Sequence, residues 1–171
     1  SLHDALPIYA TAFPHIGYNR AAELTDKNER RKQGLPPRSP MRAIDDSVGL
    51  QNTYLGEDAD WVRYETIVST VPEQIAISPG YIQREWEENG RKYYHYKMDA
   101  PILNFYSFLS AKYQVYREKW NGIDIEIYYH KPHDYNIDKM VKSIKHSIDY
   151  FSKNFSPYQH KQMRIIEFPR Y

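Results

Sequence analysis

Two Asn-Gly dipeptides, Asn89-Gly90 and Asn121-Gly122, each separate segments in which apolar and polar residues alternate. Asn-Gly favours a two-residue hairpin turn, because both central positions need a positive φ that these residues adopt at low cost. The first turn would place Trp86 opposite Tyr93, an aromatic pair that stabilises neighbouring strands. The chain is therefore expected to contain at least two antiparallel hairpins.

The second Asn-Gly turn also predicts the register of its strands, because the residue pairs that it creates sort by chemistry onto two faces. The pairs are Lys119–Asp124 and Arg117–Glu126 on one face, and Trp120–Ile123 and Tyr116–Ile127 on the other. Opposite charges on one face and apolar side chains on the other are typical of an antiparallel sheet that buries a single face.

Alternation predicts further strands before and around these turns, at residues 62–70, 74–78, 81–87 and 91–97. The 17 tyrosines fit this pattern, since aromatic residues are favoured in half-buried strands. The segment 105–120 leads into the second hairpin. Its expected core residues are Phe105, Phe108, Leu109, Tyr113 and Val115.

After residue 131 the apolar period changes from two residues to three or four, which predicts a helix over 136–154. The residues of its apolar face are Ile137, Met140, Val141, Ile144, Ile148, Phe151 and Phe155. Asn136 stands where an N-cap is expected, and Pro157 marks the exit. A last strand is predicted at 163–168.

The first 60 residues are less regular. Residues 1–8 look like translated sequencing adapter, so we treat them as a non-native leader and expect native sequence from about Tyr9. Residues 9–60 are expected to be an irregular segment with one short helix ending near Gln33, before Gly34. Residues 61–130 are expected to form an antiparallel β domain, and residues 131–171 a short α/β segment.

A run of basic residues accompanies the short helix and has two interpretations, a solvated face or a phosphate-binding patch. Its members are Lys27, Arg30, Arg31, Lys32, Arg38 and Arg42. Acidic residues interrupt or flank the run, no aromatic residue within it could stack on a base, and the net charge of the chain is only +1. We therefore favour the solvated face and expect no nucleic-acid partner.

Residues with catalytic or metal-binding chemistry are present but form no recognisable motif. The chain has no cysteine, and none of the seven histidines begins a His-Glu-x-x-His zinc motif. His130 and His133 stand three apart with Pro132 between them, and a surface loop is favoured over a metal site because no third ligand is implied. His146 and His160 are expected at the surface.

Acidic residues such as Glu65, Glu87, Asp99 and Glu167 cannot be paired as acid and base from sequence alone. Gly-rich phosphate loops and a Gly-x-Ser-x-Gly elbow are absent, and no apolar run is long enough for a membrane helix. We therefore assign no catalytic, cofactor-binding or metal-binding residue to this chain, and expect no membrane segment in it.

Several stretches together resemble the aminopeptidase N-like family of gluzincin zinc metallopeptidases. The stretches are residues 98–111, the hairpin around Asn121-Gly122, the predicted helix over 136–154 with residues 154–171, and the shorter segments 13–18, 23–24, 30–35, 60–61 and 75–80. More narrowly, the chain resembles a bacterial branch in which the peptidase is joined to membrane-spanning segments of an ABC-transporter permease type. The likeness covers nearly everything from residue 9 onward but contains no catalytic signature.

The resemblance implies a fold and a place in a larger enzyme. In that family a saddle- or sandwich-like antiparallel β domain precedes a thermolysin-like catalytic domain. The likeness would put residues 9–130 in the later part of the β domain and residues 131–171 at the start of a truncated catalytic domain. The change of period near residue 131 agrees with that boundary.

The resemblance also implies a function. The chain would be a non-catalytic fragment of a membrane-linked aminopeptidase that removes N-terminal residues from peptides. Zinc and the peptide substrate would be bound by the full-length parent, and the remainder of the peptidase chain would be the fragment's partner. The fragment by itself is expected to be soluble and inactive, with membrane association only through the parent.

A rival interpretation is a stand-alone β-rich module that binds a peptide or a glycan through its tyrosine-lined strands. Aromatic strand residues occur more often as core and sheet surface than as a binding groove, so the fragment is favoured. The two differ in stability, because a module should unfold cooperatively and the last helix and strand of a fragment should lack part of their packing.

Overall fold

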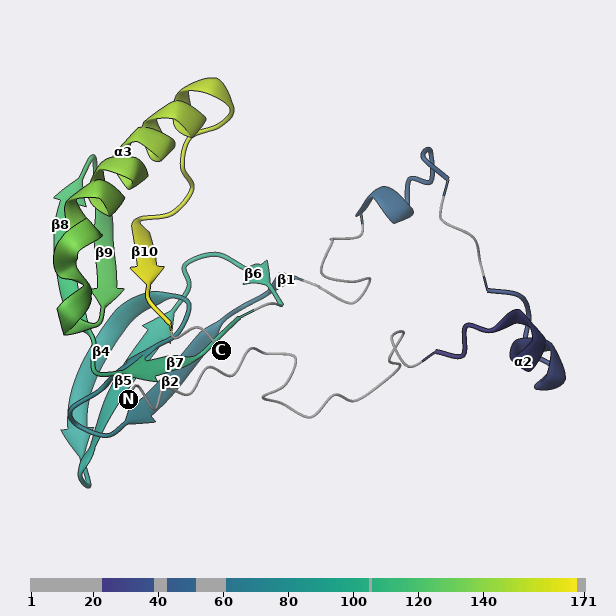
Figure 1. Ribbon diagram of the computed structural model, residues 1–171, viewed down its shortest axis with the longest axis horizontal. Helices are drawn as coiled ribbons and strands as arrows, with labels where there is room; N and C mark the ends of the chain where they lie inside the picture. Colours follow the sequence, from purple (N-terminus) through teal and green to yellow (C-terminus); the bar gives the residue numbers. More distant parts are fainter. Residues whose placement is uncertain (1–22, 39–42, 52–60, 105, 169–171) are drawn as a thin grey trace.

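A computed structural model describes residues 23–38, 43–51, 61–104 and 106–168 (Figure 1). The described chain is mainly β, with antiparallel sheets and one long helix, as predicted. Several features named from the sequence lie outside the described residues. They are the proposed leader at residues 1–8, the expected native start near Tyr9, and the residues His3, His15, Arg42 and Phe105. Among the residues described, no helix has the length and apolar character needed to cross a bilayer.

Half of the strand pairings join consecutive strands, and the other half join strands that lie further apart in the sequence. The strands are β1 (Trp61–Val62), β2 (Glu65–Thr70), β3 (Ile75–Ile77), β4 (Tyr81–Glu88), β5 (Arg91–Lys97), β6 (Ile102–Leu103), β7 (Leu109–Ala111), β8 (Gln114–Trp120), β9 (Ile123–Tyr129) and β10 (Gln162–Ile166). The helices are α2 (Lys27–Lys32), η2 (Gly49–Gln51), η3 (Lys131–Asn136) and α3 (Ile137–Asn154).

Both predicted hairpins form. Asn89, Gly90, Asn121 and Gly122 all have positive φ, at 50°, 72°, 49° and 80°, which is the conformation that a two-residue hairpin turn requires. Trp86 pairs with Tyr93 across β4 and β5, with ring centroids 5.1 Å apart. The four predicted pairs across β8 and β9 are all in register.

The first sheet has the order β2-β5-β4, and tyrosines form the core on one of its faces. Tyr94 and Tyr96 are 2% and 3% exposed, and their hydroxyls donate to the carbonyls of Gln74 and Ala76 at 3.2 and 3.0 Å. These carbonyls belong to β3 and the residue before it. The tyrosines therefore fasten β3, which pairs with β7, to the first sheet.

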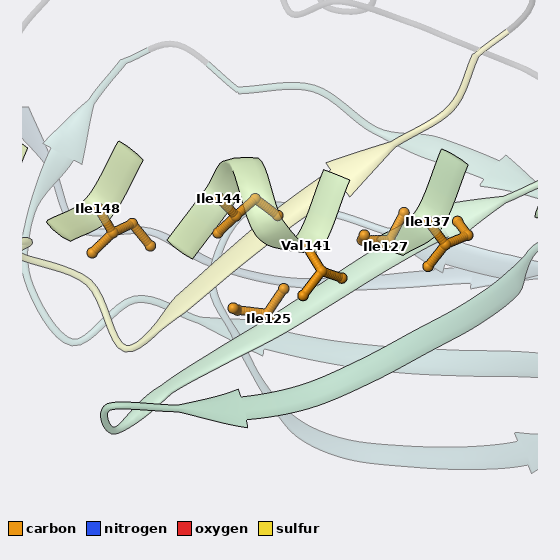
Figure 2. Packing of buried hydrophobic residues seen from close by; sticks show 6 residues of the cluster. All are labelled: Ile125, Ile127, Ile137, Val141, Ile144 and Ile148. Carbon is orange, nitrogen blue, oxygen red and sulfur yellow. The ribbon is translucent and has the colours of Figure 1, made fainter. Parts of the chain in front are cut away.

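The second sheet has the order β10-β9-β8, with β10 parallel to β9 and β8 antiparallel to it. Helix α3 connects β9 to β10 and covers one face, where the aliphatic side chains of helix and strand meet (Figure 2). The buried residues are Ile125, Ile127, Ile137, Val141, Ile144 and Ile148. The switch of period at residue 131 therefore marks the helical part of a β-α-β unit, whose first strand, β9, precedes it.

The opposite face of this second sheet packs on β3 and β7. Tyr113, Tyr128, Ile77 and Ala111 are the buried residues of that contact, and Ile166 of β10 joins them. The two sheets thus share strand β3 between them, because β3 also contacts the tyrosine core through Ala76.

Three details of the sequence prediction are wrong. Asn136 makes no side-chain capping bond to α3, because the 3-10 turn η3 precedes the helix and supplies its first turn. Phe151 and Phe155 are 58% and 74% exposed instead of buried, since the last turn of α3 extends past the packed face. The strand predicted at 62–70 is divided into β1 and β2, which pair with different partners.

Helix α2 forms as predicted near the amino end of the described chain. The Asp26 side chain caps it by accepting from the backbone N–H groups of Asn28 and Glu29 at 2.9 and 2.8 Å. Gly34 follows with a φ of 69°, which suits the residue after a helix.

Candidate functional site

The ends of two parallel strands bring together the residues with the most chemistry in the described chain. Strand β9 ends at Tyr129 and β10 at Ile166, and the next residues are His130 and Glu167. In sheets with parallel strands and a connecting helix, ligands bind outside the carboxyl ends of the strands. A functional site is therefore expected at this edge of the sheet.

Glu167 is the centre of this cluster. Its carboxylate accepts the backbone N–H of His130 at 2.7 Å and pairs with Nδ1 of His133. Its own backbone N–H donates to the carbonyl of Tyr128 at 2.9 Å. Partial burial acts to raise the pKa of the Glu167 carboxyl, but the His130 N–H and the His133 imidazole outweigh it and hold that pKa below its ordinary value.

The two imidazoles stand on the same side of the η3 turn, with ring centroids 5.4 Å apart and planes at 74°. The His133 side chain is 48% exposed, so its ring is open to solvent beyond the Glu167 contact. Sequence analysis placed His130 and His133 in a surface loop and left Glu167 unpaired. A separation of 34 residues between His133 and Glu167 hides this contact from any local motif.

Two of the other acidic residues named from the sequence form surface ion pairs. Glu65 contacts His95 at 2.8 Å and Lys97 at 2.9 Å. Both contacts lower the pKa of the Glu65 carboxyl, and the contact with Lys97 has the larger effect. Asp99 contacts Lys161 at 2.5 Å, which lowers the Asp99 pKa. Exposed pairs of this kind contribute little to stability and carry no catalytic geometry.

Glu87 is exposed on β4, and His146 and His160 are exposed as predicted. These residues lie on different elements: Glu87 on the first hairpin, His146 on α3, and His160 in the segment that precedes β10. The structure therefore does not bring them together into a site.

Arg164 of β10 joins the two sheets, and its role was not visible in the sequence. Its guanidinium donates to the carbonyls of Ser78 and Gly80 at 2.9 and 2.5 Å, and its carbon lies 5.3 Å from the ring centre of Tyr96. The Arg164 Nε atom is 3.4 Å from a carboxylate oxygen of Glu126, an ion-pair contact without good hydrogen-bond geometry. The side chain is only 10% exposed.

Clefts lie on either side of this junction. One, of about 610 Å³, is mainly apolar and is lined by residues that include Met98, Ile102, Leu103, Tyr158, Met163 and Ile166. The other, of about 810 Å³, is lined by tyrosines and charged residues. Its lysines and arginines all have acidic partners within the lining, as Lys92–Glu85, Lys119–Asp124, and Arg117 and Arg164 with Glu126. Its remaining charge, Glu118, pairs with Lys145 outside the cleft.

The aromatic residues of the first sheet are occupied within the protein. The hydroxyls of Tyr94 and Tyr96 are bound to backbone carbonyls. The Trp86 ring stacks on Tyr93, and Arg84 lies 5.0 Å from the centre of the same ring. A sugar ring stacks on an open aromatic face, so this pair offers no ready platform for one.

The basic run around α2 is interrupted by a structural residue. Arg30 is 7% exposed, and its guanidinium binds Glu23 at 2.8 Å and the carbonyls of Leu24 and Pro36 at 2.7 and 2.9 Å. Lys32 pairs with Glu29 at 2.6 Å. These contacts favour a solvated helix face with one inward arginine over a phosphate-binding patch.

In the part of the chain that the structure describes, no group of three or more His, Cys, Asp or Glu side chains is arranged to hold a metal ion. The catalytic zinc of a gluzincin peptidase therefore does not fit the described residues, and the sequence contains no His-Glu-x-x-His motif for it. In comparisons with known proteins, no protein-family model and no curated protein sequence matches this chain.

Proposed function

We propose that this chain is a non-catalytic part of a membrane-linked zinc aminopeptidase, comprising the later part of its N-terminal β domain and the opening of its thermolysin-like domain. In this role it forms one wall of the substrate cleft and supports the catalytic half of the larger protein. The larger protein removes N-terminal residues from peptides, and its zinc is bound by residues outside this sequence.

The observation that best supports the proposal is the β9-α3-β10 unit. Mixed sheets with an antiparallel edge strand, like β10-β9-β8, are common among large sheets. Among the described strands β10 has a neighbour only on its β9 side, so its other edge is available to a following strand. An α/β unit of this kind, placed directly after an antiparallel body, is what the opening of a second domain requires.

The junction at Arg164 gives the two parts a fixed relation. Its guanidinium is bonded to carbonyls on either side of Pro79, so the first strand after α3 is anchored to the β body. A wall for a substrate cleft must hold its position against the catalytic half. The apolar cleft next to Arg164, shared by β10 and the β body, supports the proposal, because binding sites are usually concave and mainly apolar.

The membrane link and the peptide substrate rest on the family resemblance of the sequence. The residues described here do not fit the zinc ligands of such a peptidase. What this chain's own residues do is structural: they pack the sheets, orient β10 and line the cleft.

The test compares two proteins, the 171-residue chain and the product of the same reading frame extended by several hundred residues. The extended protein is expected to contain one tightly bound zinc per chain by elemental analysis and to hydrolyse aminoacyl p-nitroanilides. The shorter chain is expected to show no turnover. Peptidase turnover by the 171-residue chain, or a reading frame that closes without a zinc motif, would overturn the proposal.

A binding module remains the competing function, and the occupied tyrosine hydroxyls weigh against it. It would be favoured by a sharp thermal transition of the isolated chain together with saturable binding of a peptide or glycan. A broad transition with exposed apolar surface, detected by a fluorescent dye, is the result that the aminopeptidase proposal predicts.

A further inference from the structure

We propose that His130 and His133 form a binding site for a divalent transition-metal ion of the zinc type, with Glu167 as the partner that orients His133. The site lies at the carboxyl ends of β9 and β10. It is separate from the catalytic zinc of the proposed aminopeptidase, and it goes beyond the proposed function, since neither depends on the other.

The turn that carries the two imidazoles is preformed. The backbone N–H of His133 donates to the carbonyl of His130 at 2.8 Å, and Pro132 restricts the chain between them. His130 precedes the turn in an extended conformation and His133 departs from helical geometry within it, and the two rings lie 5.4 Å apart. The two imidazoles are therefore close together before any ion is bound.

The separation of the rings suits a shared ion. Zinc–nitrogen bonds of 2.0–2.1 Å at a tetrahedral angle place the centroids of two ligating imidazoles about 5 Å apart. The observed separation is 5.4 Å. With Nδ1 of His133 held by Glu167, the His130 side chain is the one that would rotate to aim a nitrogen at an ion on the Nε2 side of His133.

Glu167 fixes which nitrogen of His133 faces outward. The carboxylate accepts the proton on Nδ1, which leaves Nε2 as the free nitrogen with a lone pair. Histidines that bind metal ions usually donate their other ring N–H to a carboxylate in this way. The second Glu167 oxygen holds the backbone N–H of His130, so one carboxylate organises both ligand residues.

Within the described residues, the His130 ring makes no hydrogen bond and the His133 ring makes one, at Nδ1. The ion would be reached from solvent, because the His133 side chain is 48% exposed. Two protein ligands leave the remaining positions to water, so the affinity should be weaker than that of a closed four-ligand zinc site. This weaker, exchangeable binding distinguishes the site from a catalytic zinc.

The experiment is a titration of the purified, chelator-treated 171-residue chain with zinc chloride at neutral pH, followed by calorimetry. One equivalent of zinc is expected to bind. His130→Ala and His133→Ala should each weaken zinc binding by at least about 10-fold. Glu167→Gln should weaken it by about 10-fold, which is the lower end of the range observed when a hydrogen-bond partner of a metal ligand is lost. His146→Ala, which removes an exposed imidazole on α3, is the matched control and should bind as the parent chain does.

A second readout does not depend on the variants folding. In the unaltered chain, zinc should shift the imidazole proton signals of His130 and His133 in the NMR spectrum and leave the His146 signal in place. Zinc binding that survives the double substitution of His130 and His133, or equal shifts at all the histidines, would overturn the site. Unchanged affinity in Glu167→Gln would overturn the role given to that carboxylate.

The outcome is independent of the aminopeptidase proposal, because the titration measures zinc binding without turnover. Loss of zinc in the histidine variants of the 171-residue chain identifies this site even if the extended protein is inactive. Turnover by the extended protein, in turn, would persist when His130 and His133 are replaced.

Discussion

The two cores of this protein are built from different chemistry. Under α3 the second sheet buries isoleucines and a valine, which contribute apolar area without direction (Figure 2). On the first sheet, Tyr94 and Tyr96 combine apolar rings with hydroxyls that bind carbonyls at β3. The aliphatic core holds a helix against a sheet, whereas the tyrosine core also fixes which stretch of β3 lies over it.

This difference matches what each core must position. Helix α3 is held by four buried aliphatic residues spread along its length, Ile137, Val141, Ile144 and Ile148. Apolar contact over this length holds the helix without directional bonds. Strand β3 has only three residues and, among the described strands, pairs only with β7, so directional bonds from the tyrosines help to keep it in place. Hydrogen bonds to carbonyls provide that direction.

The largest effect is expected in the aliphatic core. Ile127→Ala removes a side chain that is 1% exposed, and should lower the free energy of unfolding by about 3 kcal/mol, from lost burial and the cavity that remains. Urea titration followed by circular dichroism measures it. Ile67→Ala, at a position 59% exposed on β2, is the control and should change stability by less than about 0.5 kcal/mol.

Replacing Arg164 tests the link between the two cores. Arg164→Met should destabilise the chain by about 2 kcal/mol, because it leaves two carbonyls without their donor and Glu126 with Arg117 as its remaining cation. Arg117 pairs with the same Glu126 at 3.0 Å but is 61% exposed. Arg117→Met should therefore cost no more than about 0.5 kcal/mol, and equal losses in the two variants would show that burial does not decide the effect.

A single hydroxyl should have a smaller effect in the tyrosine core. Tyr96→Phe keeps the ring and leaves the Ala76 carbonyl buried without its donor, which should cost about 1.5 kcal/mol. Tyr150→Phe, on an exposed position of α3, should be neutral. Loss of protection from hydrogen exchange at β3 in Tyr96→Phe, greater than at α3, would support the view that the hydroxyl positions that strand.

The smallest effect concerns a charge pair beside the aliphatic core. Lys145 of α3 contacts Glu118 of β8 at 2.5 Å. The contacts with Lys145 and Tyr116 both lower the pKa of the Glu118 carboxyl, and the contact with Lys145 has the larger effect. A lowered pKa means that the folded state favours the charged carboxylate. The stabilisation is therefore complete above the ordinary glutamate pKa of about 4.3 and is lost as pH falls through the lowered value.

Acid unfolding of the parent chain and of Glu118→Gln checks this prediction. The parent should be the more stable protein at pH 7, and the difference should shrink as the pH is lowered below about 4. A difference that stays constant down to the lowest pH would show that the pair contributes through packing and not through charge.

Much of the fold was predictable because its signals are local. Both hairpins follow from Asn-Gly turns whose flanking side chains match in charge and size, and α3 follows from its apolar spacing. The parallel pairing of β10 with β9 and the pairing of β3 with β7 were not predicted, since strands of three to five residues have no pattern that selects a distant partner.

The candidate sites depended on contacts that no spacing rule contains. His130 and His133 were identified as a pair, but their carboxylate, Glu167, comes from another strand. Arg164 was one residue in an apolar strand, and only the turn after β3 gives it partners. The exposure of Phe151 and Phe155 was missed because helical periodicity does not say where the covering sheet stops.

The contacts of Arg164 also set a sequence of events during synthesis. Its carbonyl partners, Gly80 and Ser78, precede it by 84 and 86 residues. At roughly 5–20 residues per second, the acceptor carbonyls leave the ribosome several seconds before the arginine. Both hairpins can close within that interval, since hairpins form in microseconds. The Arg164 bonds between the two sheets therefore form only after both hairpins have had time to close.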